Sequence, residues 1–238
     1  MKGTVKPATK PLVVIPAFNE ALIIEKTFTA LSQYPQYDYL YVDDGSTDET
    51  ALLLKNLGAN VLSLPFNLGV GVAMRTGFKY AQKNNYESVV QFDADLQHKP
   101  EFISKLIQAL EFADVVVGSR FRGESKYQVS LMRKFAMRLL RFAVSRHSGE
   151  KLTDVTSGFR AANKKAIEVF AEDYPAEYLA DTVESLILAA DKNLKIKEIP
   201  VVMQVRQGGQ PSQNLLKSSL YLGRSVLVLI ASLSLRKR

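Results

Sequence analysis

Short apolar runs alternate with helical patterns along the first half of the chain. The runs cover residues 12–15, 39–42, 60–64, 88–92 and 114–118, and each has the length and apolar character of a buried parallel strand. Periodic stretches typical of helices fill the segments between them. Strands that alternate with helices predict an α/β fold, with a mostly parallel central sheet flanked by helices.

Polar motifs follow three of these predicted strands at their carboxyl ends. They read P-A-F-N-E at residues 16–20, D-D-G-S at 43–46 and D-A-D-L-Q at 93–97. Ligands bind at the carboxyl ends of the strands in a parallel sheet. Three such motifs are therefore more consistent with one shared binding site than with three independent turns.

The third motif has the residues of a metal site. An extended backbone would place Asp93 and Asp95 on the same side, with Gln97 following if the chain bends back. Two carboxylates and an amide oxygen suit a Mg²⁺ or Mn²⁺ ion that holds a diphosphate. An isolated D-x-D is more often a turn that caps a helix. The other strand-end motifs and the later basic segments favour the metal–diphosphate site.

The composition excludes several kinds of metal and catalytic site. The 238 residues, 47% of them hydrophobic, suffice for one sizeable core. The chain has no cysteine and only two histidines, His98 and His147, which excludes disulfides, thiolate sites and multi-histidine zinc sites. Any metal must therefore be held by oxygen. Residues 1–10 are polar and lack the apolar core of a signal peptide, so secretion is not expected.

The net charge of +7 gathers in residues 120–146 and 236–238 and implies an anionic partner. The predicted helix 129–146 is amphipathic and basic, which suits an anionic lipid surface, although a core helix with a solvated basic face fits equally. Its basic face carries Lys134, Arg138 and Arg141. Its apolar face carries Leu131, Phe135, Leu139 and Phe142.

The second half of the chain gives weaker patterns. Residues 153–160 are expected to form a strand or loop, 182–193 a helix, and 195–205 a strand. A last helix is expected over 215–235. Its uninterrupted apolar part is shorter than the ~20 residues that a membrane span needs, so we expect it to lie on a membrane or bind a membrane partner.

Five motifs occur in the order V-V-I-P-A-F-N-E, V-D-D-G-S-T-D-E-T, N-L-G-V-G-V-A-M-R, F-D-A-D-L-Q-H-K-P-E and V-G-S-R-F. Together they resemble the family-2 glycosyltransferases of GT-A fold, which implies a GT-A, Rossmann-like sheet. With T-S-G-F-R and E-I-P-V added, the chain looks most like the polyprenyl-phosphate sugar synthases of the dolichol- and undecaprenyl-phosphate types. The resemblance covers about residues 11–212. The loop G-G-Q-P-S at 208–212 and the missing C-terminal spans depart from that pattern.

The resemblance implies a role for each matching position. Asp44 would read the nucleotide base. Arg75 is a further candidate for phosphate contact, although a place on a solvated helix face would explain this arginine equally well. The nucleotide-sugar residues would be Pro16, Phe18, Glu20, Asp43, Asp44, Arg75 and Asp93. The metal ligands would be Asp93, Asp95 and Gln97. The acceptor phosphate would meet Arg120, Arg133 and Arg206, and the catalytic set would be Asp95, Arg120 and Arg206.

The implied reaction is inverting sugar transfer from a nucleoside-diphosphate sugar to a polyprenyl phosphate such as undecaprenyl phosphate. UDP-hexose is favoured over GDP-mannose because the chain looks bacterial. A phosphate monoester, with a second pKa near ~6, is largely dianionic at pH 7 and needs no strong base. Arginines would relieve repulsion between the two phosphates.

Other functions stay open at this point. A glycan hydroxyl acceptor would need a carboxylate base, for which Asp181 and Glu184 are candidates. A nucleic-acid-binding protein or an inactive partner in a membrane complex is a remote alternative. Because Phe135 and Phe142 fall on the apolar face of their predicted helix, we expect no nucleic-acid partner.

We expect one catalytic domain over residues 1–212, with a nucleotide-sugar half at about 11–120 and an acceptor half at about 121–212. Residues 213–238 would form the helix that associates with a membrane or a membrane-protein partner. The protein is expected at the cytoplasmic face of the membrane as a peripheral protein, and homo-oligomer formation stays open.

Overall fold

The computed structural model describes residues 10–121, 131–176 and 181–204, of which 131–136 are described by backbone alone. The expected loop 206–212 and the expected last helix 215–235 lie outside these ranges, as does the boundary at residue 212.

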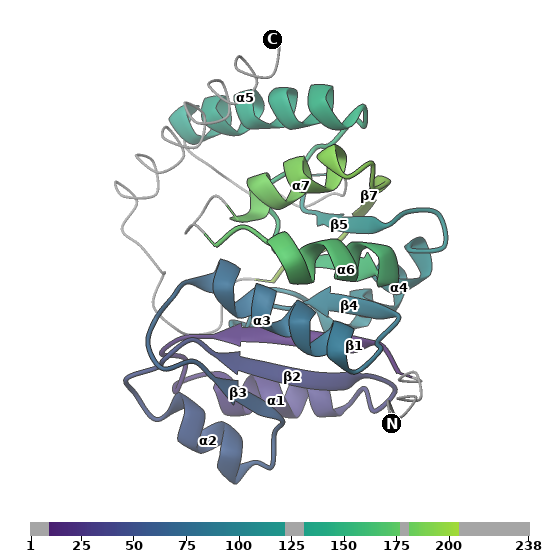
Figure 1. Ribbon diagram of the computed structural model, residues 1–238. Helices are drawn as coiled ribbons and strands as arrows, with labels where there is room; N and C mark the ends of the chain where they lie inside the picture. Colours follow the sequence, from purple (N-terminus) through teal and green to yellow (C-terminus); the bar gives the residue numbers. More distant parts are fainter. Residues whose placement is uncertain (1–9, 122–130, 177–180, 205–238) are drawn as a thin grey trace, which may run out of the picture.

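A seven-stranded sheet forms the centre of the molecule (Figure 1). The strand order is β3-β2-β1-β4-β6-β5-β7, and all neighbours are parallel except β6, which is antiparallel to both β4 and β5. This confirms the predicted mostly parallel α/β sheet. The strands are β1 (Leu12–Ala17), β2 (Asp38–Asp43), β3 (Val61–Ser63), β4 (Ser88–Gln91), β5 (Val115–Ser119), β6 (Arg160–Asn163) and β7 (Ile196–Pro200).

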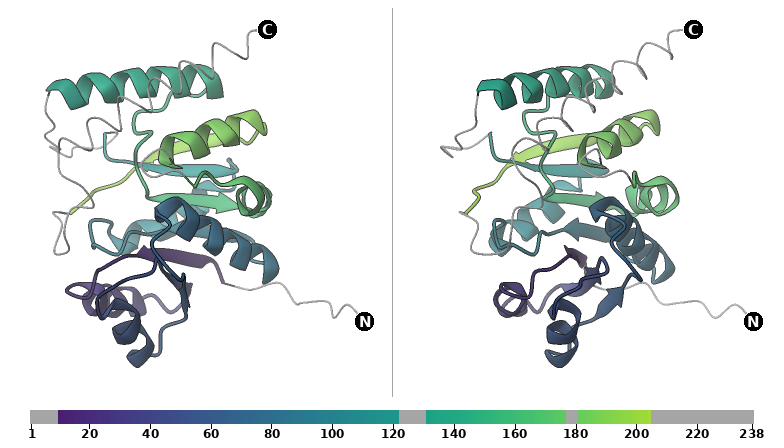
Figure 2. Two further views of the ribbon diagram at one scale, coloured as in Figure 1. Left: turned by 60° about the vertical axis from the view of Figure 1, so that its left-hand side comes forward. Right: turned by 90° about the vertical axis from the view of Figure 1, so that its left-hand side faces the viewer.

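Helices cover both faces of the sheet (Figure 2). One face carries α1 (Ile24–Ser32), α2 (Thr50–Asn56) and α4 (Ile103–Ala109), which a 3-10 turn at Pro100–Phe102 precedes. The other face carries α3 (Val70–Lys83), α6 (Lys164–Asp173) and α7 (Asp181–Asp191), and α5 (Leu131–Ser148) packs on α7. No helix within the described ranges is long and apolar enough to cross a bilayer.

The apolar run of β1 divides between the two faces. Leu12 and Val14 pack with α3, whereas Val13 and Ile15 pack with α1, and all four are fully buried. Successive side chains of a strand point to opposite faces, so a strand covered on both sides must be apolar at every position. This is why the first strand was readable as an unbroken hydrophobic stretch.

The reversed strand β6 and the helix after it were not predicted. The Asn163 side chain caps α6 by accepting a hydrogen bond from the Ala166 amide at 3.1 Å, and Ala166, Ile167 and Phe170 bury the inner face. An Asn followed by apolar residues at helical spacing is a readable helix start. Because β6 runs backward, its first residue, Arg160, lies opposite Gln91 at the end of β4.

Candidate active site

The candidate site lies at the edge of the sheet where β1, β2, β4, β5 and β7 end and β6 begins. The motifs at residues 16–20, 43–46 and 93–97 and the side chain of Arg120 all follow strands at this edge. The structure thereby confirms that the strand-end motifs share one edge. Their individual roles in binding stay predictions.

The loops after β1 and β2 are bonded to each other. Asn19, in the left-handed region at φ 55°, accepts from the Thr47 amide at 2.8 Å and donates its own amide to Ser46 Oγ at 3.0 Å. The Glu20 amide donates to Thr50 Oγ1 at 2.9 Å. These bonds fix the two nucleotide-candidate loops as one unit. Phe18 projects from that unit with 40% of its surface exposed, so it is not a core aromatic.

Asp44 has a structural role that the sequence did not reveal. It is buried, and its two carboxylate oxygens accept from the amides of Leu68 and Gly69, each at 2.8 Å. Burial raises the pKa of Asp44 above the ordinary carboxyl value. The two hydrogen bonds favour the charged form and oppose this effect without cancelling it. Asp44 therefore holds the glycine turn that opens α3, in addition to any contact with a base.

The acidic motif forms a turn rather than the extended segment that was expected. Strand β4 ends at Gln91, and Leu96 adopts φ 56°. Asp95 accepts from the Gln97 amide at 3.0 Å, a local bond typical of Asx turns. Two other segments pin this turn: the Thr27 hydroxyl of α1 donates to the Ala94 carbonyl at 2.6 Å, and the Gln204 amide donates to the Gln97 carbonyl at 2.9 Å.

Asp93 is oriented by a buried histidine. His98 Nε2 lies 2.9 Å from Asp93 Oδ2, and the imidazole stacks on Phe159 with ring centroids 4.6 Å apart. Its Nδ1 is buried with no hydrogen-bond partner among the residues described. Burial alone would raise the pKa of Asp93, but the charge and bond of His98, a bond from Gln91 and the charge of Arg120 together lower it.

The acidic turn fits a hard divalent cation shared with a diphosphate. No three His, Asp or Glu side chains gather as a self-sufficient metal site in the described ranges. Magnesium, however, is commonly held by one or two carboxylates with substrate phosphates and water as the other ligands. The Asp93 side chain is 38% exposed, and His98 orients it as partner groups orient metal-binding carboxylates. Asp93, Asp95 and Gln97 stay the predicted ligands.

Arg120 is held by a buried carboxylate that sequence reasoning did not select. Its Nε and Nη2 donate to the two oxygens of Asp154 at 2.6 and 2.8 Å, and Nη2 also donates to Thr156 Oγ1 at 2.8 Å. Asp154 is 1% exposed. Burial would raise its pKa, but the bonds and charge of Arg120 hold it below the usual range. The guanidinium is thus fixed before any ligand arrives.

Glu198, on β7, holds the Asp154 loop in turn. This buried carboxylate accepts from the Thr153 amide at 2.9 Å, the Thr153 hydroxyl at 2.8 Å and the Asp154 amide at 2.6 Å. Glu198 therefore positions Asp154, and Asp154 positions Arg120. The sequence hinted at these two positioning carboxylates only by Asp154, which lies just ahead of the T-S-G-F-R motif, and by the glutamate of E-I-P-V.

Substituting Glu198→Gln should lower the free energy of unfolding by about 2 kcal/mol, because the amide brings N–H donors to a site lined by donors and removes the charge that strengthens the bonds. Urea unfolding monitored by circular dichroism measures this. The control is Glu111→Gln, which makes the same change at an exposed position and should be neutral. Equal stability of the two variants would contradict the role of Glu198.

The remaining arginine candidates are not gathered with Arg120 in the described structure. Arg75 donates to the carbonyl oxygens of Ala171 and Glu172, so it links α3 to α6. Arg133 lies in the first turn of α5, where only the backbone is described. Arg206 lies beyond the described residues. The roles of all three in phosphate binding stay predictions.

A buried polar cluster lies beneath the acidic turn. Arg160 donates to the Ser157 carbonyl at 2.7 Å and to Ser185 Oγ at 2.8 Å. Asp181, 2% exposed, has one oxygen with no hydrogen-bond partner within the described ranges. Burial raises the pKa of Asp181 to about 6, and the charge of Asp93 adds to the effect while that of Arg160 opposes it. A buried carboxyl whose pKa is raised in this way is a candidate general base.

A hollow of about 630 Å³ lies beside the acidic turn, between α1 and the segment after β7. Leu96, His98 and Gln204 form part of its wall with Lys26 and Thr29 of α1. None of the predicted nucleotide residues lines it. It borders the buried His98 from the α1 side.

Known proteins resemble this chain in sequence and in fold. The model of the family described as Glycosyl transferase family 2 matches residues 12–171. A UDP-N-acetylglucosamine–dolichyl-phosphate N-acetylglucosaminyltransferase of Methanococcus voltae is 32% identical over 209 residues, covering 79% of this chain and 83% of that protein. A polyprenol monophosphomannose synthase of Mycolicibacterium smegmatis is 28% identical over 220 residues, covering 87% and 82%.

The fold also matches solved structures. Glucosyl-3-phosphoglycerate synthase from Mycobacterium tuberculosis, in complex with Mn²⁺ and UDP-glucose, superposes with a TM-score of 0.72 at 23% sequence identity. The match covers 92% of this chain and 78% of that one. At this identity the likeness establishes the common fold of the two chains.

Proposed function

Because the chain belongs to glycosyl transferase family 2 and is therefore a glycosyltransferase, we propose that it transfers a sugar from a UDP-hexose to a polyprenyl phosphate with inversion. One observation carries the proposal. The acidic turn and the Arg120–Asp154 pair share a sheet edge, close enough for the charge of Arg120 to lower the pKa of Asp93. The polyprenyl and dolichyl phosphate chemistry named for two relatives supports the acceptor.

On the donor side, the two bonded loops would receive the nucleotide. The exposed ring of Phe18 offers a face for stacking on the base, and Pro16, Glu20 and Asp43 would complete the nucleotide site. Asp93, Asp95 and Gln97 would hold a Mg²⁺ or Mn²⁺ ion. When bound, that ion supplies Lewis-acid neutralisation of charge on the leaving diphosphate. His98 keeps Asp93 pointed in one direction as the leaving group develops charge.

On the acceptor side, Arg120 would bind the lipid phosphate. An oxygen of that phosphate attacks the anomeric carbon as the bond to the nucleoside diphosphate breaks. The phosphate dianion is nucleophilic near neutral pH without losing a further proton. A fixed guanidinium offsets the repulsion between acceptor and donor phosphates at no ordering cost, and Arg133 and Arg206 would add to it.

We extend the proposal to the organisation and location of the chain. Residues at about 11–120 bind the donor and those at about 121–212 the acceptor, with 213–238 as a membrane-associating or partner-binding helix. A water-soluble donor and a lipid acceptor can meet only at a membrane surface. The enzyme would therefore act as a peripheral protein at the cytoplasmic face, and homo-oligomer formation is compatible with this.

The decisive experiment incubates the full chain and Mn²⁺ with a panel of nucleotide sugars, in the presence of undecaprenyl phosphate, of a sugar hydroxyl acceptor or of neither, and measures nucleoside diphosphate release. We expect release from a UDP-hexose that depends on the lipid phosphate. Release that depends instead on a sugar hydroxyl acceptor would replace this acceptor assignment. No release with any donor and acceptor would overturn the proposed reaction.

A second candidate function, transfer to a glycan hydroxyl, is favoured by Asp181. Such an acceptor needs a base, and Asp181 is a buried carboxyl with a pKa of about 6 within electrostatic reach of Asp93. The Asp181→Asn variant separates the two functions. It should lose roughly 10²–10⁴-fold in transfer to a hydroxyl acceptor but retain transfer to polyprenyl phosphate.

The same variant should change stability in a pH-dependent way. The folded state holds the Asp181 proton more tightly than the unfolded chain, so stability falls as pH rises from about 4 toward 6. Asn imitates the protonated acid. Asp181→Asn should therefore be about 2 kcal/mol more stable than the unaltered chain above pH 7 and equal to it near pH 4. Urea unfolding at both pH values measures this, with the exposed Asp173→Asn as control.

A further inference from the structure

The loop that leads into β6, residues 153–159, contacts both charged parts of the candidate site. Near its start, Asp154 binds the guanidinium of Arg120. Near its end, Gly158 lies against the carboxylate of Asp93. The loop includes the first four residues of the T-S-G-F-R motif. It therefore joins the predicted acceptor arginine to the predicted metal ligand.

Gly158 leaves no room for a side chain. A Cβ at this position would lie 3.1 Å from Gln91 Nε2 and 3.2 Å from each carboxylate oxygen of Asp93. Favourable contacts of carbon lie at about 3.5–4.0 Å, so one of the groups would have to move. Gly158 is not among the glycines with a positive φ. The space beside Asp93, and not the conformation of the backbone, is therefore what requires a glycine here.

The Asp93 carboxylate is held on its own side of this contact. Its Oδ2 lies 2.9 Å from His98 Nε2, and the Gln91 side chain also bonds to it. The imidazole of His98 is fixed in turn by Phe159, which stacks on it with ring centroids 4.6 Å apart. Phe159 is itself buried and meets Phe92 edge to face at 5.8 Å. Any shift of the carboxylate would therefore disturb bonds to a rigid buried group.

The loop is held on the other side of the contact. The buried guanidinium of Arg160 donates to the Val155 carbonyl at 3.0 Å and to the Ser157 carbonyl at 2.7 Å. The Phe159 carbonyl accepts from an amide of β5 at 2.8 Å. These bonds lie on either side of Gly158 in the sequence. The backbone of Gly158 is thus fixed against Asp93 and has little freedom to retreat.

We propose that Gly158 is a positioning residue for the metal site, because its missing side chain lets Asp93 keep the direction in which it holds the divalent cation. The inference rests on the proposed function, which makes Asp93 a metal ligand. Mg²⁺ requires oxygen ligands at about 2.1 Å in nearly ideal octahedral geometry, so small displacements of a ligand weaken binding. The end of the motif then has three tasks. Gly158 makes room, Phe159 supports His98, and Arg160 holds the loop.

The test compares Gly158→Ala with the unaltered chain for binding of Mn²⁺ in the presence of UDP or GDP. Electron paramagnetic resonance of the free ion measures this without any sugar transfer. The dissociation constant for Mn²⁺ should rise about tenfold in Gly158→Ala, as is typical when a group that orients a metal ligand is changed.

The control is Gly149→Ala, which adds the same methyl group where no atom lies within 4 Å of it. Gly149 has a φ of 73°, so alanine strains this backbone and lowers stability without crowding a carboxylate. This variant should bind Mn²⁺ as the unaltered chain does. Urea unfolding of both variants shows that they are folded when Mn²⁺ binding is measured.

Equal Mn²⁺ affinity of Gly158→Ala and the unaltered chain would overturn the inference and leave the proposed sugar transfer standing. An equal loss in Gly149→Ala would also overturn it, as would a Gly158→Ala chain that does not fold, because the glycine would then serve the fold alone. A tenfold loss confined to Gly158→Ala, without sugar transfer to any polyprenyl phosphate, would support the inference and contradict the proposed function. An unaltered chain that binds no Mn²⁺ with either nucleotide would overturn the metal site on which both depend.

Discussion

The Asp93→Asn variant is expected to transfer sugar roughly 10²–10³-fold more slowly than the unaltered chain and to lose its response to Mn²⁺. The amide removes the charge that would hold the cation, but it remains close in shape to the carboxylate and can still accept from His98. The fold should therefore be retained. Asp95→Asn should behave in the same way, since its amide oxygen can still accept from the Gln97 backbone. The measurement is nucleoside diphosphate release over a Mn²⁺ titration.

The matched control is Asp173→Asn, which removes one carboxylate at an exposed position on α6. It should leave both turnover and the Mn²⁺ response unchanged. If the Asp93 and Asp95 variants turn over at nearly the normal rate, the acidic turn is only a structural turn, and the metal–diphosphate assignment fails.

Arg120→Ala should lose both activity and stability. It leaves Asp154 buried without its counter-ion, which costs about 3–5 kcal/mol of unfolding free energy. Arg120→Lys restores the charge but not the two-pronged contact with Asp154. We expect the lysine variant to recover part of the stability while acceptor-dependent turnover stays roughly 10²-fold low. Recovery of full turnover by lysine would show that a point charge suffices and would contradict the need for the fixed guanidinium.

The pH dependence of stability gives an independent measure of the same pair. The pKa of Asp154 is lowered in the folded state, so its contribution to stability is present above the ordinary carboxyl pKa of about 4 and is lost as pH falls below that value. Urea unfolding across this pH range should show that slope in the unaltered chain and lose most of it in Arg120→Ala. Arg146→Lys, an exposed charge-preserving change, is the control.

The sequence predicted the parts of the fold that follow from local pattern. The β1 residues are apolar at every position because helices cover both faces of the sheet. The polar motifs were readable because they interrupt such runs at the strand ends. Strand β6 was not readable as a buried strand, because its four residues begin with a buried arginine and end with the cap of α6.

The positioning residues of the site could not be predicted for a different reason. Glu198 reaches Asp154 across 44 positions of the chain, and Thr27 reaches Ala94 across 67. Neither contact leaves a local pattern, since each depends on which strands and helices become neighbours. The acidic turn shows the converse case. The predicted extended backbone at residues 93–97 was wrong. The predicted position of this motif at the shared edge was correct, because the order and direction of the strands determine that position.

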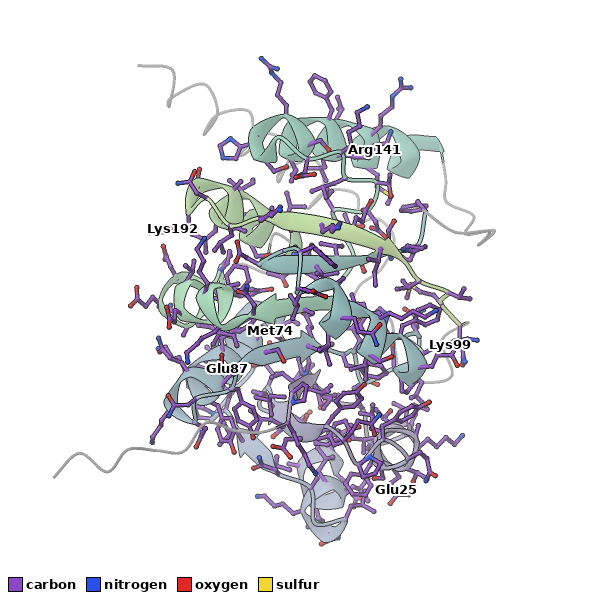
Figure 3. The ribbon with its side chains drawn as sticks, turned by 90° about the vertical axis from the view of Figure 1, so that its right-hand side faces the viewer. Glu25, Met74, Glu87, Lys99, Arg141 and Lys192 are labelled. Atoms are coloured by element: carbon purple, nitrogen blue, oxygen red, sulfur yellow. The ribbon has the colours of Figure 1, made fainter. Side chains whose placement is uncertain are left out.

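The edge opposite the candidate site is made largely of tight turns from helix to strand. Gly58, Asn85 and Asn193 adopt left-handed conformations there, at φ values of 71°, 55° and 55°, before β3, β4 and β7. Lys192, labelled in Figure 3, stands at the last of these turns. Since the chain contains no cysteine, a single thiol introduced at this position would be unique. It would allow a fluorophore or a solid support to be attached with the edge that carries the candidate site facing the solution.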